Sequence, residues 1–95
     1  MNKNIIILYE DVLKKVLDEF GISQKDMFYS NEAECVQARM ALIVALTDIG
    51  LSDKEIAECT KKMRRCSICK IRNRYRDADA PWTVRMCIER IRRKE

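Results

Sequence analysis

The sequence predicts an all-α domain, a compact bundle of about six helices. Its 95 residues are the length of one domain, which we take as residues 1–95. Two glycines and one proline leave too few tight turns for a sandwich or barrel of short strands. Apolar residues recur instead at three- and four-residue intervals, which is the spacing of one face of a helix.

The first two helices follow from this spacing and from two turn residues. Residues 5–20 carry apolar side chains at helical intervals and predict an amphipathic helix. Gly21 supplies the left-handed residue that ends many helices. Ser23 can then cap a short helix that ends near residues 27–28, with Asp26 three residues after the cap.

The middle of the chain predicts a buried central helix. Asn31 is a suitable N-cap, and the acids in the next turn would complement the helix dipole. Within residues 36–49, the stretch 40–46 is apolar on every side. A helix of this kind lies at the centre of a bundle, with the other helices packed around it. Gly50 ends it.

Two further helices follow in the C-terminal part. Ser52 and Glu55 form a capping box at the start of a short helix over residues 53–59. After a polar turn at residues 60–63, a second helix over residues 64–76 carries apolar side chains three and four residues apart.

The last helix is expected to follow a loop at residues 77–80, with Pro81 in its first position. Aromatic residues at helical spacing are more often core than nucleic-acid contacts, so Tyr75 is expected to pack in the core. The inward side of the last helix is expected to consist of Trp82, Met86, Ile88 and Ile91.

Charge is distributed unevenly along the chain. Residues 1–60 hold 6 basic and 11 acidic side chains, whereas residues 61–95 hold 13 basic and 4 acidic ones. The stretch 61–76 has eight Lys or Arg and no acid. A segment of this kind attracts polyanions, although a solvated basic face needs no ligand. The acidic first half is interpreted as a solvated face that could also bind a protein partner or a second copy.

Residues 52–76 have the pattern of a helix-turn-helix, with a capped helix, a short turn and a second helix that has a polar side. The major groove of DNA admits one helix, whose apolar side must be held by the protein. With Ile68 turned inward, the side chains expected at base edges are Arg64, Arg65, Cys66, Ser67, Lys70 and Asn73. Those expected at phosphates are Lys61, Lys62, Arg72 and Arg74. The predicted partner is double-stranded DNA.

Other classes of function are weighed against this one. The basic helix could bind an acidic protein or RNA, or belong to a helical hairpin with no ligand. An enzyme is not expected, because the chain has no histidine and so lacks the commonest general base. No cofactor is expected either, and the two glycines cannot form a phosphate-binding loop.

Cysteine content and hydropathy indicate the compartment. Five cysteines, an odd number, favour a reducing environment over a disulfide framework. Cys66 and Cys69, with Cys59 upstream, resemble part of a zinc site, but zinc needs four ligands and packing is the preferred explanation. Without an export signal or an apolar run long enough for a bilayer, the chain is expected to be cytoplasmic, with no membrane contact.

Several segments occur in the order and spacing of a known domain. They are Val16 to Ser23, Ala38 to Ala41, Gly50-Leu51-Ser52 with Glu55-Ile56, and Arg64 to Ile68. From Val16 to Tyr75 the chain resembles the C-terminal DNA-binding domain of the bacterial replication initiator DnaA, in the Trp-repressor-like helix-turn-helix superfamily. The resemblance places residues 64–67 on the family's base-reading Asp-His-Thr-Thr, and Lys70 on a recognition-helix histidine.

The resemblance implies duplex DNA binding and a role in the control of transcription or replication. The chain departs from the family at Lys61-Lys62, where the family has paired glycines, and at residues 64–67, where its signature is replaced. Residues 31–36 include two acids where the family has a basic segment. The family's ATPase module is absent, which by analogy suggests a standalone regulator.

Overall fold

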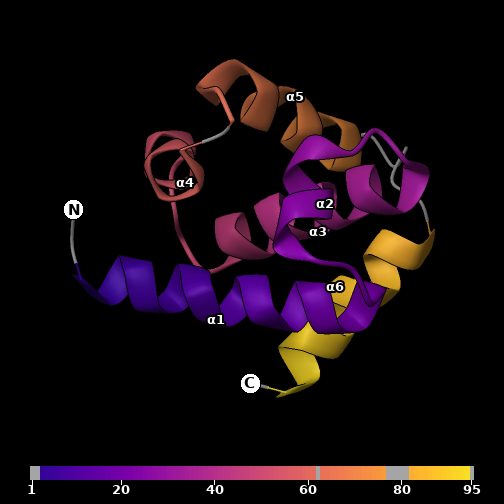
Figure 1. The fold of residues 1–95 in the computed structure, drawn as a ribbon. Coiled ribbons are helices and arrows are strands. Elements are labelled where there is room, and N and C mark those ends of the chain that lie inside the picture. The colour runs from indigo at the N-terminus through magenta and orange to yellow at the C-terminus, as the bar shows by residue number, and fades with distance from the viewer. Residues whose placement is uncertain (1–2, 62, 77–81, 95) are drawn as a thin grey trace.

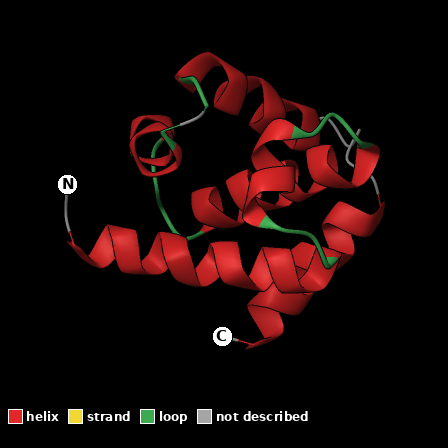
Figure 2. Ribbon diagram, viewed as in Figure 1, coloured by secondary structure: helices red, strands yellow, loops and turns green. Residues whose placement is uncertain are grey.

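The computed structural model describes residues 3–61, 63–76 and 82–94, and these form six helices without a strand (Figures 1 and 2). The all-α prediction is confirmed. The helices are α1 (Lys3–Phe20), α2 (Gln24–Tyr29), α3 (Ala33–Asp48), α4 (Asp53–Thr60), α5 (Arg65–Arg76) and α6 (Trp82–Lys94).

Helix α3 is the centre of the bundle, because each of the other five helices packs against it (Figure 1). All seven residues from Met40 to Leu46 are buried. Apolar side chains on every side of α3 allow it to bury surface of α1, α5 and α6 at once, which is the main favourable term in folding. The predicted central helix is confirmed.

The predicted caps of α2 and α4 are also confirmed. The Ser23 hydroxyl accepts a hydrogen bond from the Asp26 N–H at 3.2 Å. At the start of α4, the Ser52 hydroxyl accepts from the Glu55 N–H at 3.2 Å, and the Ser52 N–H donates to the Glu55 carboxylate at 3.0 Å. This reciprocal pair satisfies two of the N–H groups that a helix start leaves unbonded.

The start of α3 differs from the prediction that Asn31 caps it. The helix begins at Ala33, and Glu32 is the capping residue without a side-chain hydrogen bond. The Ser30 hydroxyl instead accepts from the Glu32 N–H at 3.2 Å, which holds the turn before the helix. A local side-chain bond one residue earlier has therefore displaced the expected cap.

Helix α6 also differs, because Trp82 is 71% exposed and the prediction that it packs inward was wrong. Val84 and Ile88 are buried, and Trp82 is about 200° around the helix from Val84 at 100° per residue. Met86 and Tyr75 are half-buried, and Ile91 is buried as expected. The loop expected at residues 77–80 and the start expected at Pro81 lie outside the described residues.

The phenol of Tyr9 is buried in the core between α1 and its neighbours. Burial raises the pKa of Tyr9 to about 12, with smaller contributions from the nearby Cys59 and Glu10. The Tyr9 side chain therefore stays protonated and uncharged in the folded protein until the pH approaches 12.

This burial predicts a loss of stability in alkali. The unfolded tyrosine ionises near its ordinary pKa of 10.0, whereas the folded one stays protonated up to about 12. The free energy of unfolding should therefore fall between these pH values, by about 2 kcal/mol from this group. Urea unfolding at several pH values should show a shallower decline for Tyr9→Phe. The matched variant at the exposed Tyr29, Tyr29→Phe, should keep the full decline, and equal slopes for both variants would contradict the interpretation.

Candidate nucleic-acid interface

Helix α5 is held to the bundle by one apolar side. It packs against α3 and α4, and Ile68 is fully buried among them. Ile71 and Tyr75 continue this side as half-buried residues against the core. The guanidinium of Arg85 in α6 lies 5.5 Å from the centre of the Tyr75 ring, a cation–π distance. The inward orientation predicted for Ile68 is confirmed, and it fixes which side of α5 faces outward.

Every side chain that the sequence predicts at base edges is exposed, with Arg64 just before α5 and the other five on the helix. Lys70 and Asn73 lie about 200° and 140° around the helix from Ile68, at 100° per residue. The Asn73 amide also lies 3.7 Å from the Cys69 sulfur on the same helix. The exposed residues are Arg64, Arg65, Cys66, Ser67, Lys70 and Asn73.

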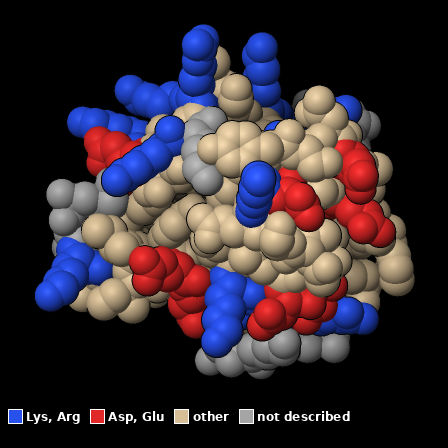
Figure 3. All heavy atoms as spheres, in the orientation of Figure 1, with Lys and Arg blue, Asp and Glu red and all other residues tan. Residues whose placement is uncertain are grey.

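Cations dominate the surface around this side of α5. Lys61 and Arg74, both predicted at phosphates, are exposed, whereas Lys62 lies outside the described residues. Figure 3 shows Lys and Arg side chains projecting from the edge of the molecule where α5 lies, at the top of the view. Most acidic side chains visible from this side lie below them. The surface is therefore suited to a polyanion.

Arg72 differs from the other predicted phosphate contacts. Its guanidinium forms an ion pair with the carboxylate of Asp53 in the first turn of α4, and its Nη2 lies 3.9 Å from the Cys69 sulfur. Its Nε is buried without a hydrogen-bond partner among the described residues. Arg72 follows Ile68 by four residues, so it lies toward the buried side of α5. The structure places it between two helices instead of on the outward side.

A shallow hollow of about 480 Å³ lies beside α5 and adds a residue that the sequence reasoning missed. Arg39 of α3 borders it together with Arg64, Ser67 and Lys70, and no acid lines it among the described residues. The Arg39 guanidinium donates to the Ser30 carbonyl at 2.6 Å and to the Cys35 carbonyl at 3.5 Å. One sequence signal was available, since Arg39 is the only basic residue between Lys25 and Lys54.

Lys61, at the end of α4, has a left-handed backbone with φ of 58°. Its N–H donates to the Ala57 carbonyl at 2.9 Å, which closes the helix. A residue with a Cβ atom pays about 1–2 kcal/mol in this conformation, so glycine is the residue that would fit best. The backbone at Lys61 thus has the conformation that glycine favours, at a position where the sequence has a cation.

The cysteines do not gather into a ligand cluster. All five are free: Cys35 and Cys87 are buried, Cys59 and Cys69 are half-buried, and Cys66 is exposed. Among the described residues, no group of three or more cysteine or carboxylate side chains is placed to hold a metal ion. Burial raises the pKa of the Cys59 thiol, with Glu55 and Glu58 adding to the effect.

Comparison of the chain with protein-family models, with curated proteins and with solved structures finds no match in any of the three. Within the part of the chain that the structure describes, no helix is both long and apolar enough to cross a membrane.

The ion pair between Asp53 and Arg72 is expected to stabilise the packing of α4 on α5. Both side chains are mostly buried, with 20% and 26% of their surface exposed. A double-mutant cycle with Asp53→Asn and Arg72→Gln should give a coupling energy of about 1–2 kcal/mol, between the values for surface and buried pairs. Urea unfolding of the four proteins measures it. A coupling near zero would show that each residue contributes independently of the other.

Proposed function

We propose that the chain binds double-stranded DNA and places the outward side of α5 in the major groove. The observation that carries this proposal is an exposed helix side with cations and no acid, on a helix whose opposite side is anchored by the buried Ile68. A helix held in this way can enter a groove without separating from its domain. Helices α4 and α5 would then act as a helix-turn-helix.

The proposed contacts divide into two groups by the chemistry of their targets. Arg64, Arg65, Cys66, Ser67, Lys70 and Asn73 would approach base edges, where Arg can bridge guanine and Asn can bridge adenine. Phosphates would be contacted by Lys61, Arg74 and Arg39, and by Lys62 according to the sequence. Arg72 is left out, because its guanidinium is already paired with Asp53.

We further propose a role in the control of transcription or replication. The support is the resemblance of Val16 to Tyr75 to the C-terminal domain of DnaA, together with the cationic outward side of α5. A protein-binding or RNA-binding module with the same basic helix is the alternative, and the duplex assay below distinguishes it.

The first experiment compares ligands. Mobility shifts on a random-sequence duplex, on its separated strands and on an RNA hairpin should show the tightest binding to the duplex. The affinity should fall as salt rises, because phosphate contacts release counterions. A duplex-selection experiment should then yield a preferred sequence. Equal or tighter binding to RNA, or no binding to any nucleic acid, would contradict the proposal.

Base-contacting and phosphate-contacting residues should respond differently to substitution. Arg65→Ala and Lys70→Ala should each weaken binding to the selected sequence by about 1–3 kcal/mol, with a smaller loss on random duplex. Lys14→Ala removes an exposed cation from α1 and serves as the control, with little change expected on either duplex. An equal loss on selected and random duplexes would place both residues at phosphates.

Lys61→Gly removes the charge of a proposed phosphate contact without destabilising the fold. Glycine relieves the left-handed backbone, so the free energy of unfolding should stay the same or rise by up to about 1 kcal/mol. Binding to all duplexes should weaken alike, and the salt dependence should lose about one counterion. Lys61→Arg, which keeps the charge, should bind like the parent protein. An unchanged salt dependence in Lys61→Gly would remove Lys61 from the interface.

A further inference from the structure

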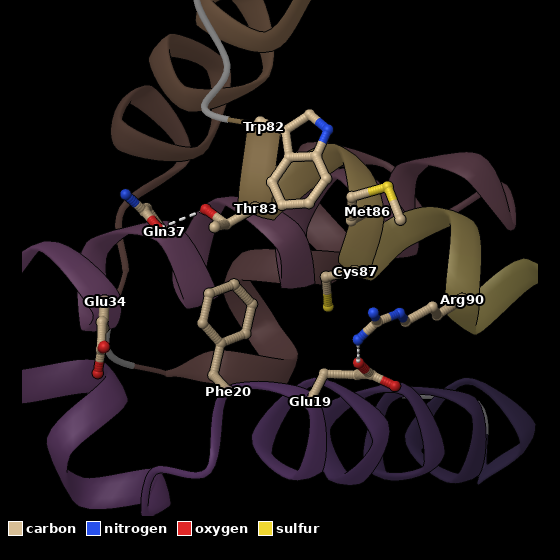
Figure 4. Close-up of a pocket in the computed structure, with 9 residues that line it drawn as sticks. All are labelled: Glu19, Phe20, Glu34, Gln37, Trp82, Thr83, Met86, Cys87 and Arg90. Carbon is tan, nitrogen blue, oxygen red and sulfur yellow. Dashed lines mark hydrogen bonds and ion pairs between the residues drawn. The ribbon is translucent and has the colours of Figure 1, made fainter.

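A second cavity lies away from α5, between α1, α3 and α6, and has a volume of about 240 Å³ (Figure 4). Cavities that hold cofactors or other small molecules are usually about 300–1,000 Å³. This one is therefore the size for a single long side chain. In Figure 1, α1 and α6 lie on the other side of α3 from α5, so the cavity is separate from the proposed DNA interface.

The walls of this cavity are aromatic and apolar. Phe20 and Met86 are half-buried, whereas Trp82 is 71% exposed at the opening. Figure 4 shows these three side chains around the same space, with the Cys87 sulfur facing into it. The exposed indole of Trp82 continues the apolar surface of the half-buried Phe20 and Met86, and a continuous apolar surface of this kind is what a ligand can cover. Among the side-chain rings, the indole of tryptophan binds cations best.

The charges around the cavity leave one carboxylate unpaired. Glu19 accepts from the Arg90 guanidinium at 3.0 Å, and Gln37 accepts from the Thr83 hydroxyl at 2.6 Å. Glu34 is exposed at the edge and forms no ion pair with a described residue. Figure 4 places Trp82 and Glu34 on different sides of the cavity, so the indole is the contact partner for an ammonium or guanidinium group and the carboxylate adds a more distant attraction.

We propose that this cavity binds a Lys or Arg side chain of a partner protein. The aliphatic part of that side chain would lie between Phe20 and Met86, and its charge would face Trp82 at the opening, with Glu34 attracting it from the other side of the cavity. No described residue of α5 lines the cavity, so the partner could bind while the outward side of α5 remains accessible.

The sole tryptophan of the sequence makes the test direct, because fluorescence reports on Trp82 alone. Nα-acetyl-arginine amide is the probe, and Nα-acetyl-citrulline amide is its neutral control of the same shape. The arginine probe should change the fluorescence saturably, with a millimolar dissociation constant, and the citrulline probe should bind at least fivefold more weakly. Glu34→Gln should weaken arginine binding about two- to threefold, as expected for an exposed charge at the edge of the cavity. Glu10→Gln, which removes an exposed carboxylate of α1 outside this cavity, should leave it unchanged.

Three results would overturn the proposal. Equal binding of arginine and citrulline would indicate an apolar anchor without charge recognition. Tighter binding of spermidine than of the arginine probe would indicate that the ligand of the cavity is a free polyamine and not a protein side chain. An absence of saturable change would show that the cavity binds neither class. Urea unfolding of Glu34→Gln, with an expected free energy close to that of the parent, confirms that a lost response comes from the carboxylate and not from the fold.

Discussion

The burial of Ile68 against α3 is the interaction on which the proposed interface depends. Ile68 is the one fully buried side chain of α5 among the described residues, and the half-buried Ile71 and Tyr75 extend the apolar side that it anchors. Once Ile68 faces inward, the helical repeat determines the direction of every other side chain on α5. The apolar side that Ile68 anchors thus sets both how the helix is attached and which residues face outward.

The inward orientation of Ile68 also explains why one cation of α5 is exposed to solvent while another is paired with an acid. Lys70 follows Ile68 by two residues and is exposed, whereas Arg72 follows it by four and reaches Asp53 of α4. Local charge density in the sequence does not distinguish the two, since both lie in the same acid-free stretch. Lys70 and Arg72 differ because α4 brings Asp53 toward the side of α5 where Arg72 lies.

Features that depend on neighbouring residues were predictable from the sequence. The capping box of Ser52 and Glu55 and the cap of Ser23 occur as expected, because their partners lie three residues away. The central helix was predictable from its apolar stretch, and Ile68 from its spacing. The role of Arg39 and the partner of Arg72 were not, because their surroundings come from helices distant in the chain. The exposure of Trp82 could have been predicted from spacing, since Val84, Cys87, Ile88 and Ile91 form the buried side of α6. The prediction that Asn31 caps α3 was wrong for a local reason, since the Ser30 hydroxyl accepts the hydrogen bond from the Glu32 N–H in the turn before the helix.

The distribution of the five thiols gives the molecule a natural labelling position. Cys66 is exposed on the outward side of α5, while the other four are half-buried or buried and the pKa of the Cys59 thiol is raised. A maleimide reagent under mild conditions will therefore modify Cys66 ahead of the rest. A spectroscopic reporter can thus be attached to the native chain on this helix, with no engineered cysteine.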